Sequence, residues 1–155
     1  MIVIGLDPGS ICFGVGIIKN EKGKNYYLHS ETIKLKERDF YSKMKTLWKR
    51  VGEIYDSFPI DEAAIEEGFL GKNVKSMNIL SKVRGVVLAS LLIKNIYLKF
   101  YSPRQVKVAL TGNGNATKSQ VNNAIKLFLN LKEREIDYDE SDALAVAYCH
   151  SLNLK

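Results

Sequence analysis

Acidic residues stand at the ends of the most apolar segments of this chain. The four acids concerned come from three distant parts of the sequence: Asp7 after the run 2–6, Glu66 after the run 63–65, and Asp139 and Asp142 before the stretch 143–147. A fold that brings these segments together makes an oxygen-rich pocket, which suits hard divalent cations such as Mg²⁺. The formal net charge of the chain is +6. An acidic pocket on a positively charged protein indicates chemistry on a polyanion.

The spacing of apolar residues predicts an alternation of strands and helices. Strands are predicted over 2–7, 12–18, 26–34, 61–66 and 97–101, and polar turn residues make the first three an antiparallel meander. Helical spacing and helix-start signals predict helices over 38–57, over 74–94, from Pro103, after Thr117 and over 141–153. The order βββαβαβααα predicts an α/β fold, a five-stranded mixed sheet flanked by helices.

Two of these helices show apolar residues at helical spacing. In 38–57 the apolar stripe consists of Phe40, Met44, Leu47, Trp48, Val51, Ile54 and Tyr55. In 74–94 the apolar positions include Met77, Leu80, Val83, Val87, Leu88 and Leu91.

Composition limits the classes of protein to be considered. At 155 residues, one domain over 1–155 is expected. The pI of about 9.2 favours a phosphate-bearing partner. Cys12 and Cys149 match no disulfide or zinc pattern, which indicates reduced thiols. The longest apolar stretch, 86–93, is shorter than a spanning helix requires, and the chain opens without a basic leader, so we expect a cytoplasmic protein with no membrane contact.

Each acid also has an ordinary structural explanation. Asp7 could simply stabilise an Asp-Pro-Gly turn. Glu66 and Glu67 are adjacent and point to opposite faces of a strand, and the pattern does not choose between them. Asp139 could be the N-cap of the last helix, with Asp142 as a first-turn acid that the helix dipole favours. Their spacing of three residues can nevertheless place both on one helical face.

Five motifs, in order along almost the whole chain, resemble the RuvC family of Holliday-junction resolvases. They are Ile-Gly-Leu-Asp-Pro-Gly-Ser at 4–10, Ala-Ile-Glu-Glu-Gly-Phe at 64–69 followed by Lys72-Asn73, Arg-Gln-Val-Lys at 104–107, Gly-Asn-Gly-Asn-Ala-Thr-Lys-Ser-Gln-Val at 112–121, and Asp-Glu-Ser-Asp-Ala-Leu-Ala at 139–145. The resemblance implies an RNase H-like fold and a dimeric endonuclease that cuts four-way DNA junctions.

The resemblance also implies roles for individual residues. The acidic tetrad becomes Asp7, Glu66, Asp139 and Asp142, so it favours Glu66 over Glu67. These four acids would hold two Mg²⁺ ions per site, with Mn²⁺ as a substitute, for two-metal phosphodiester hydrolysis. Lys107 and Lys118 match basic residues needed for catalysis, and we expect them to contact phosphate and stabilise transition-state charge.

Further residues are expected to contact DNA. Phe69 matches an aromatic residue used in junction engagement, and a stacking role is expected for it. The basic candidates are Lys72, Lys75, Lys82, Arg84 and Arg104. The helix over 74–94 matches the one that builds the dimer interface, although its apolar residues could all be core and its charges ordinary surface charges. A branch-migration complex is a further possible partner.

Three other functions agree with parts of the sequence. The Asp-Pro-Gly-Ser loop also resembles the first phosphate loop of actin-like kinases, but those proteins need a second loop in a second domain. A junction-binding protein without catalysis disagrees with the intact set of four acids. RNase H-like cleavage of another nucleic acid remains the main alternative, and the basic segment 104–118 fits the resolvase pattern better.

Overall fold

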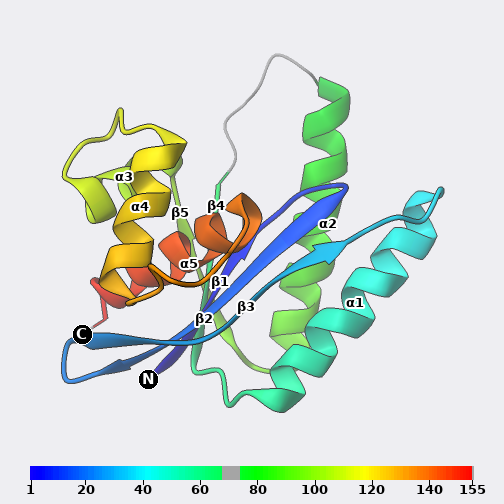
Figure 1. Cartoon of the computed structure of the whole chain (residues 1–155). Coiled ribbons are helices and arrows are strands. Elements are labelled where there is room, and N and C mark those ends of the chain that lie inside the picture. Colours follow the sequence, from blue (N-terminus) through cyan, green and yellow to red (C-terminus); the bar gives the residue numbers. More distant parts are fainter. Residues whose placement is uncertain (68–73, 155) are drawn as a thin grey trace.

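The computed structural model describes residues 1–67 and 74–154 of the chain, and its core is one mixed β-sheet (Figure 1). The strands are β1 (Ile2–Asp7), β2 (Cys12–Glu21), β3 (Lys24–Lys34), β4 (Glu62–Glu66) and β5 (Tyr97–Tyr101). Their order across the sheet is β3-β2-β1-β4-β5. β1 pairs antiparallel with β2 and parallel with β4. The predicted α/β fold with a five-stranded mixed sheet is therefore confirmed.

Helices cover both faces of the sheet. They are α1 (Phe40–Ser57), α2 (Val74–Ile93), α3 (Pro103–Thr111), α4 (Lys118–Phe128) and α5 (Tyr138–Ser151). Figure 1 shows α1 and α2 on one side, and α3, α4 and α5 on the other. Successive residues of a strand point to opposite faces. Ile4 accordingly packs in the core beneath α1 and α2, whereas Val3 packs in the core with α3, α4 and α5.

The hairpin between β2 and β3 is tighter than predicted. Its turn consists of Lys22 and Gly23, with φ of 52° and 78°. Two-residue hairpin turns with positive φ match the twist of the flanking strands. β2 therefore extends to Glu21 and β3 starts at Lys24, so that the strands are longer than the sequence pattern indicated.

α1 starts two residues later than predicted and buries a narrower stripe. Asp39 caps the helix by accepting a hydrogen bond from the Ser42 backbone N–H at 2.8 Å. Five of the seven residues of the predicted apolar stripe are buried, but Phe40 and Trp48 are exposed. Phe40 is the first residue of the helix, and Trp48 lies at one margin of the stripe.

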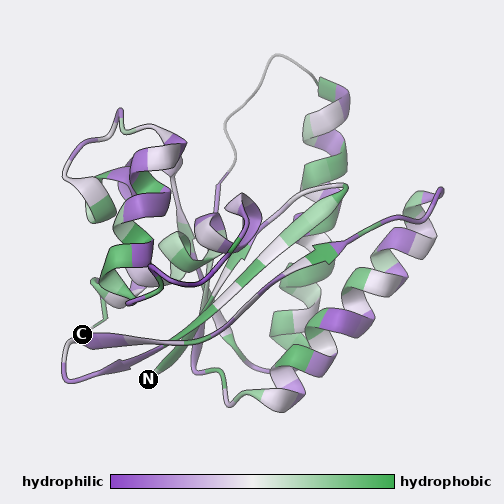
Figure 2. Ribbon diagram, viewed as in Figure 1, coloured by the Kyte–Doolittle hydropathy of each residue, from purple (hydrophilic) through white to green (hydrophobic). Residues whose placement is uncertain are grey.

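α2 carries apolar residues along its length, coloured green in Figure 2, and the fold buries only part of them. Val83, Val87 and Leu91 are buried in the core, whereas Leu88 and Leu92 are exposed. By length and composition α2 would be long and apolar enough to cross a membrane, contrary to the expectation from the sequence. Because its inner face packs in the core with β1 and β2, α2 is an integral element of this fold.

Candidate active site

Asp7 and Glu66 lie at the same edge of the sheet because they end two neighbouring parallel strands, β1 and β4. Both are half-buried. Glu67, the next residue, is exposed, and its backbone N–H donates to the Tyr101 carbonyl at 2.8 Å. The strand geometry thus distinguishes two glutamates that the residue pattern alone could not.

The first turn of α5 brings Asp139 to the same edge, but Asp139 is not its cap. The N-cap is Asp137, which forms a capping box with Glu140, so α5 begins at Tyr138 rather than at 141. The expectation of Asp139 as a possible cap was wrong, and it is Asp139, not Asp142, that lies in the first turn.

Two hydroxyl groups of β3 fix the start of α5. Thr32 donates to Asp137 at 2.7 Å, and Ser30 donates to Glu140 at 2.8 Å. These two acids are thereby held against β3. The signal for this arrangement was present in the sequence as the Asp-x-x-Glu spacing of a capping box, and it was missed.

Gly14 on β2 allows α5 to approach Asp7. Asp7 pairs with Gly14 in the sheet register. A Cβ atom at position 14 would stand 3.2 Å from the Asp7 Cβ and 2.8 Å from the Asp139 carbonyl carbon. Any larger side chain would push α5 away, so Gly14 sets the distance between the acid of β1 and the first acid of α5.

A cavity of about 300 Å³ lies between these elements. Three of the predicted acids and both predicted catalytic lysines line it: Asp7, Glu66, Asp142, Lys107 and Lys118. Apolar residues of α3, α4 and α5, among them Val106 and Val121, complete the wall. Asp139 does not line this cavity, but it is close enough for its charge to raise the pKa of Asp7.

Lys118 forms an ion pair with Asp142 in this cavity. Its ammonium donates to Asp142 Oδ2 at 2.9 Å. Lys118 is the first residue of α4 and follows the N-cap Thr117, which forms a capping box with Gln120. The predicted helix start is therefore confirmed. The hydrogen bond to Asp142 raises the pKa of Lys118, so its ammonium stays charged.

The carboxylates repel one another. Burial, followed by the charges of Asp142, Glu66 and Asp139, raises the pKa of Asp7 from 3.8 to about 7. Burial is also the largest cause that raises the pKa of Glu66, with Asp142 second, although Lys118 and other cations oppose it. Carboxylates held together against their repulsion indicate a site in which a bound cation would be stabilising.

The four acids supply the type of donor atom that a hard cation prefers, although their oxygens do not surround a common position in the structure. All four acids offer carboxylate oxygens, which suit Mg²⁺ or Mn²⁺ better than softer metals. Within 1–67 and 74–154, no three His, Cys, Asp or Glu side chains are positioned to hold one ion jointly. One reason is visible in the structure, because Lys118 already engages Asp142.

The remaining predicted DNA contacts divide into three groups. Phe69 and Lys72 lie outside the described residues. Lys75 and Lys82 are exposed on α2. Arg84 is half-buried, and its charge lowers the pKa of Glu66, which places it on the side of α2 toward the candidate active site.

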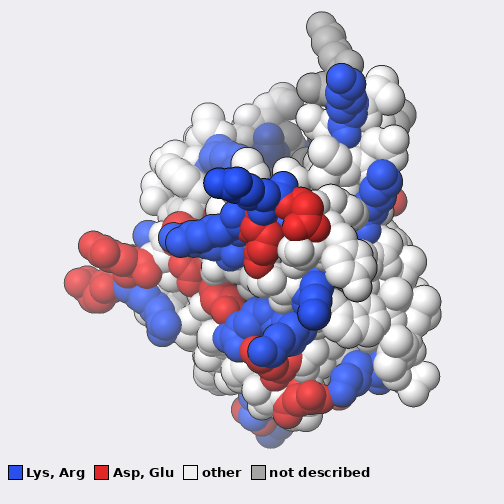
Figure 3. Space-filling view, turned by 90° about the vertical axis from the view of Figure 1, so that its right-hand side faces the viewer, with Lys and Arg blue, Asp and Glu red and all other residues white. Residues whose placement is uncertain are grey.

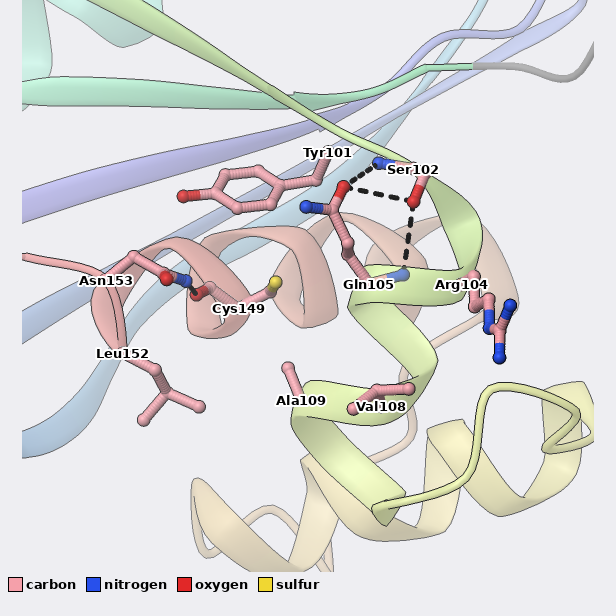
Figure 4. A pocket seen from close by; sticks show the side chains of 9 residues that line it. All are labelled: Tyr101, Ser102, Arg104, Gln105, Val108, Ala109, Cys149, Leu152 and Asn153. Atoms are coloured by element: carbon pink, nitrogen blue, oxygen red, sulfur yellow. Dashed lines mark hydrogen bonds between the residues drawn. The ribbon is translucent and has the colours of Figure 1, made fainter.

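Arg104 does not line the carboxylate cavity. It lines a different cavity of about 450 Å³, between α3 and the end of α5, together with Gln105, Val108 and Cys149 (Figure 4). Its side chain lies against Gly114, where a Cβ atom would stand 2.7 Å from Arg104 Cγ. No carboxylate lines this larger cavity, so size alone does not identify the reactive site.

Comparisons with known proteins agree with this geometry. The family model described as "Crossover junction endodeoxyribonuclease RuvC" matches residues 3–150. A protein of that name from Christiangramia forsetii is 39% identical over 153 residues, covering 98% of this chain and 80% of the relative. The relative from Porphyromonas gingivalis is 36% identical over 152 residues, covering 96% of this chain and 80% of the relative.

A solved structure shares the fold. Thermus thermophilus RuvC in complex with Holliday junction substrate superposes with a TM-score of 0.92 at 30% sequence identity, covering 99% of this chain and 94% of that one. Fold and sequence thus agree over nearly the full length. The chain belongs to the RuvC family of crossover junction endodeoxyribonucleases.

Proposed function

We propose that this protein resolves four-way DNA junctions by hydrolysing phosphodiester bonds at the carboxylate cavity. One observation carries the proposal: Asp7, Glu66 and Asp142 from three distant segments line one cavity with two lysines, in a chain of the RuvC family. The T. thermophilus relative has been solved with a Holliday junction substrate, which supports the same substrate here.

The family is one of metal-dependent nucleases. We propose two Mg²⁺ ions per site, replaceable by Mn²⁺, held by Asp7, Glu66, Asp139 and Asp142. When bound, such a pair supplies an activated water and stabilises the leaving 3′ oxygen. Asp7 is the proposed shared ligand, because it ends the central strand with acids of β4 and α5 on either side.

Lys107 and Lys118 are proposed to bind the phosphate of the cut strand. Both line the cavity from helices α3 and α4, opposite the strands that carry Asp7 and Glu66. Their ammonium groups can stabilise the negative charge that grows on the phosphate in the transition state. The Lys118 side chain is largely exposed, so its ammonium can reach a phosphate that approaches from solvent.

A homodimer is proposed to bring two such sites together. Paired cuts in a junction need two sites in a fixed relation, and a twofold dimer provides them. Leu88, Leu92 and Ile93 of α2 are 37%, 64% and 68% exposed, and an apolar face of this kind marks an interaction surface. Lys75 and Lys82 on the same helix are proposed to contact DNA beside that interface.

Several wider assignments complete the proposal. Phe69, Lys72, Arg84 and Arg104 are proposed DNA contacts, with Arg104 acting outside the carboxylate cavity. We propose that 1–155 acts as one domain, that the protein works in the cytoplasm, and that a branch-migration complex is a possible partner.

Cleavage assays on wild type and on variants of two adjacent glutamates test the proposal. Wild type is incubated with a synthetic four-way junction, a linear duplex and an RNA–DNA hybrid, each with and without Mg²⁺. We expect Mg²⁺-dependent cutting of the junction, loss of cutting in Glu66→Gln and retention in Glu67→Gln, because only Glu66 lines the cavity. Preferred cutting of the hybrid would instead support an RNase H-like nuclease.

A further inference from the structure

Three exposed apolar side chains belong to segments at the edge of the sheet where β1 ends, namely the β1–β2 loop and the first turn of α1 after β3. Ile11 is 68% exposed, Phe40 38% and Tyr41 79%. We call these three residues the rim cluster. Single exposed apolar residues are common on protein surfaces, so exposure alone does not indicate a binding role. The position and the surroundings of the rim cluster must support such a role.

Hydrogen bonds join the residues before and within the first turn of α1 to the loop that follows Asp7. The Leu35 backbone N–H donates to the Ile11 carbonyl at 2.7 Å. The Lys43 ammonium donates to the Ser10 carbonyl at 3.1 Å. The start of α1 is therefore anchored to the β1–β2 loop, and Figure 1 shows both at the upper right of the molecule.

The surroundings of the rim cluster are basic. Residues 34–45 contain five basic residues and two acidic ones, the basic residues being Lys34, Lys36, Arg38, Lys43 and Lys45. Both acids have partners within α1: Asp39 caps it through the Ser42 N–H, and Glu37 accepts from the Thr46 hydroxyl. Figure 3 shows lysine and arginine side chains spread over the face that carries α1 and α2, with acidic side chains between them.

A cation from α2 also reaches the rim cluster. The Lys82 ammonium lies 5.8 Å from the centroid of the Phe40 ring. Aromatic faces combined with positive charges bind single-stranded nucleic acid, because bases stack on the rings while the cations contact the phosphates. In a fully paired duplex the base faces are covered by neighbouring base pairs, so such a surface distinguishes unpaired from paired DNA.

We propose that the rim cluster, with Tyr41 at its tip, stacks on nucleobases left unpaired beside the cut strand. This inference rests on the proposed function and adds to it a second contact with opened DNA, made by described residues of α1 and the β1–β2 loop. A second copy of the chain is a poorer occupant, because two such basic segments would repel each other.

Binding measurements on matched variants test this proposal. The probes are a four-way junction with two unpaired thymines at its crossover and a linear duplex of equal length, both in EDTA so that neither is cut. Removal of one stacking aromatic weakens binding by about 5- to 150-fold. We expect that loss for Tyr41→Ala on the junction, less than about twofold on the duplex, and recovery in Tyr41→Phe, which keeps the ring.

The control is Tyr97→Ala. Tyr97 is 62% exposed but begins β5 at the opposite edge of the sheet, so this variant should bind both probes as wild type does. Wild-type junction binding by Tyr41→Ala, equal losses on both probes, or no recovery in Tyr41→Phe would each overturn the proposal. So would a change in the mass of Tyr41→Ala by light scattering, since that assigns the surface to contacts between copies. If wild type binds the probes but cuts no junction with Mg²⁺, the proposed function fails. The affinities of the variants in EDTA still test whether the rim cluster stacks on unpaired bases.

Discussion

Helices α2 and α5 are both rich in apolar residues, but they differ in how much of their surface the fold buries. α5 is enclosed, with nine buried residues between 141 and 151, because it lies across β1 and β2 with α3 and α4 beside it. In α2, Val83, Val87, Ser90 and Leu91 are the buried residues. The difference teaches that the number of neighbouring elements, rather than helix composition, decides how much of a helix is covered. It also separates two proposed roles, since α5 carries acids of the candidate site and α2 carries the proposed dimer surface.

Asp7→Asn should have the largest effect on cleavage and should leave junction binding intact. Bound metal contributes several kcal/mol to stabilising the transition state. Because a tenfold rate change corresponds to about 1.4 kcal/mol, we expect junction cleavage to fall about a thousandfold or more. Junction binding should persist, because it rests mainly on basic contacts with phosphate. Single-turnover cleavage and anisotropy measure the two quantities, and near-normal cutting in Mg²⁺ would remove Asp7 from the site.

Leu88→Glu should affect only assembly. A charge buried without a partner in an interface costs several kcal/mol, so the dimer dissociation constant should rise about a hundredfold or more. The thermal stability of the resulting monomer should change little, since Leu88 is exposed in the single chain. Light scattering over a range of concentrations gives the mass. The matched control is Leu127→Glu on α4, which is 51% exposed on the other side of the sheet. Equal dissociation in both variants would contradict the assignment of the interface to α2.

The stability of the metal-free protein should fall as pH rises from about 4 to about 7. Over this range the folded protein keeps a proton on Asp7, whose pKa is about 7, whereas the unfolded chain has released it near 3.8. The folded state binds more protons, so rising pH favours unfolding, and above about 7 the effect is complete. The loss is at most about 4 kcal/mol. Urea unfolding in EDTA should show a steeper fall of stability in wild type than in Asp7→Asn, in which the raised pKa values of Glu66 and Asp139 still contribute a smaller fall. Parallel curves for the two proteins would be inconsistent with this prediction.

Gly16→Ala should destabilise the protein by disturbing the packing of α5 on the sheet. A Cβ atom at Gly16 would stand 2.5 Å from the Leu144 backbone nitrogen in α5, so the helix would have to shift. Overpacking of this kind costs about 1–3 kcal/mol. Gly52→Ala in α1 is the control: no atom lies within 4 Å of its Cβ position, and replacing a helical glycine should gain up to about 1 kcal/mol. Thermal melts of the two variants should shift in opposite directions, and a neutral Gly16→Ala would show that α5 can move.

The types and starts of most elements could be predicted from the sequence. Capping boxes at Ser102 and Thr117 begin α3 and α4 where their residues indicated. Such signals are readable because the bonds involved join residues three positions apart. The capping box at Asp137 is a local signal of the same kind. The predicted start of α5 at residue 141 did not use it and is three residues too late.

Resemblance supplied the list of site residues, and the structure tested their proximity. It brings Asp7, Glu66, Asp142, Lys107 and Lys118 to one cavity, with Asp139 nearby. It does not bring Arg104 there, although Arg104 lies only three residues before Lys107 on α3. Sequence proximity could not reveal this separation, because the packing of the Arg104 side chain against Gly114 depends on a loop that follows the helix.

By itself, the sequence determined the order of strands and helices, the positive charge and the positions of Asp7 and Glu66 at strand ends, since these follow from local spacing and composition. Tertiary structure decided which acids meet. Parallel pairing of β1 with β4 aligned Asp7 with Glu66, and Gly14 let α5 approach with Asp139. It also decided that Trp48 and one face of α2 stay exposed. These outcomes depend on contacts between residues far apart in the chain, and only the packed sheet and helices determine which side chains those contacts reach.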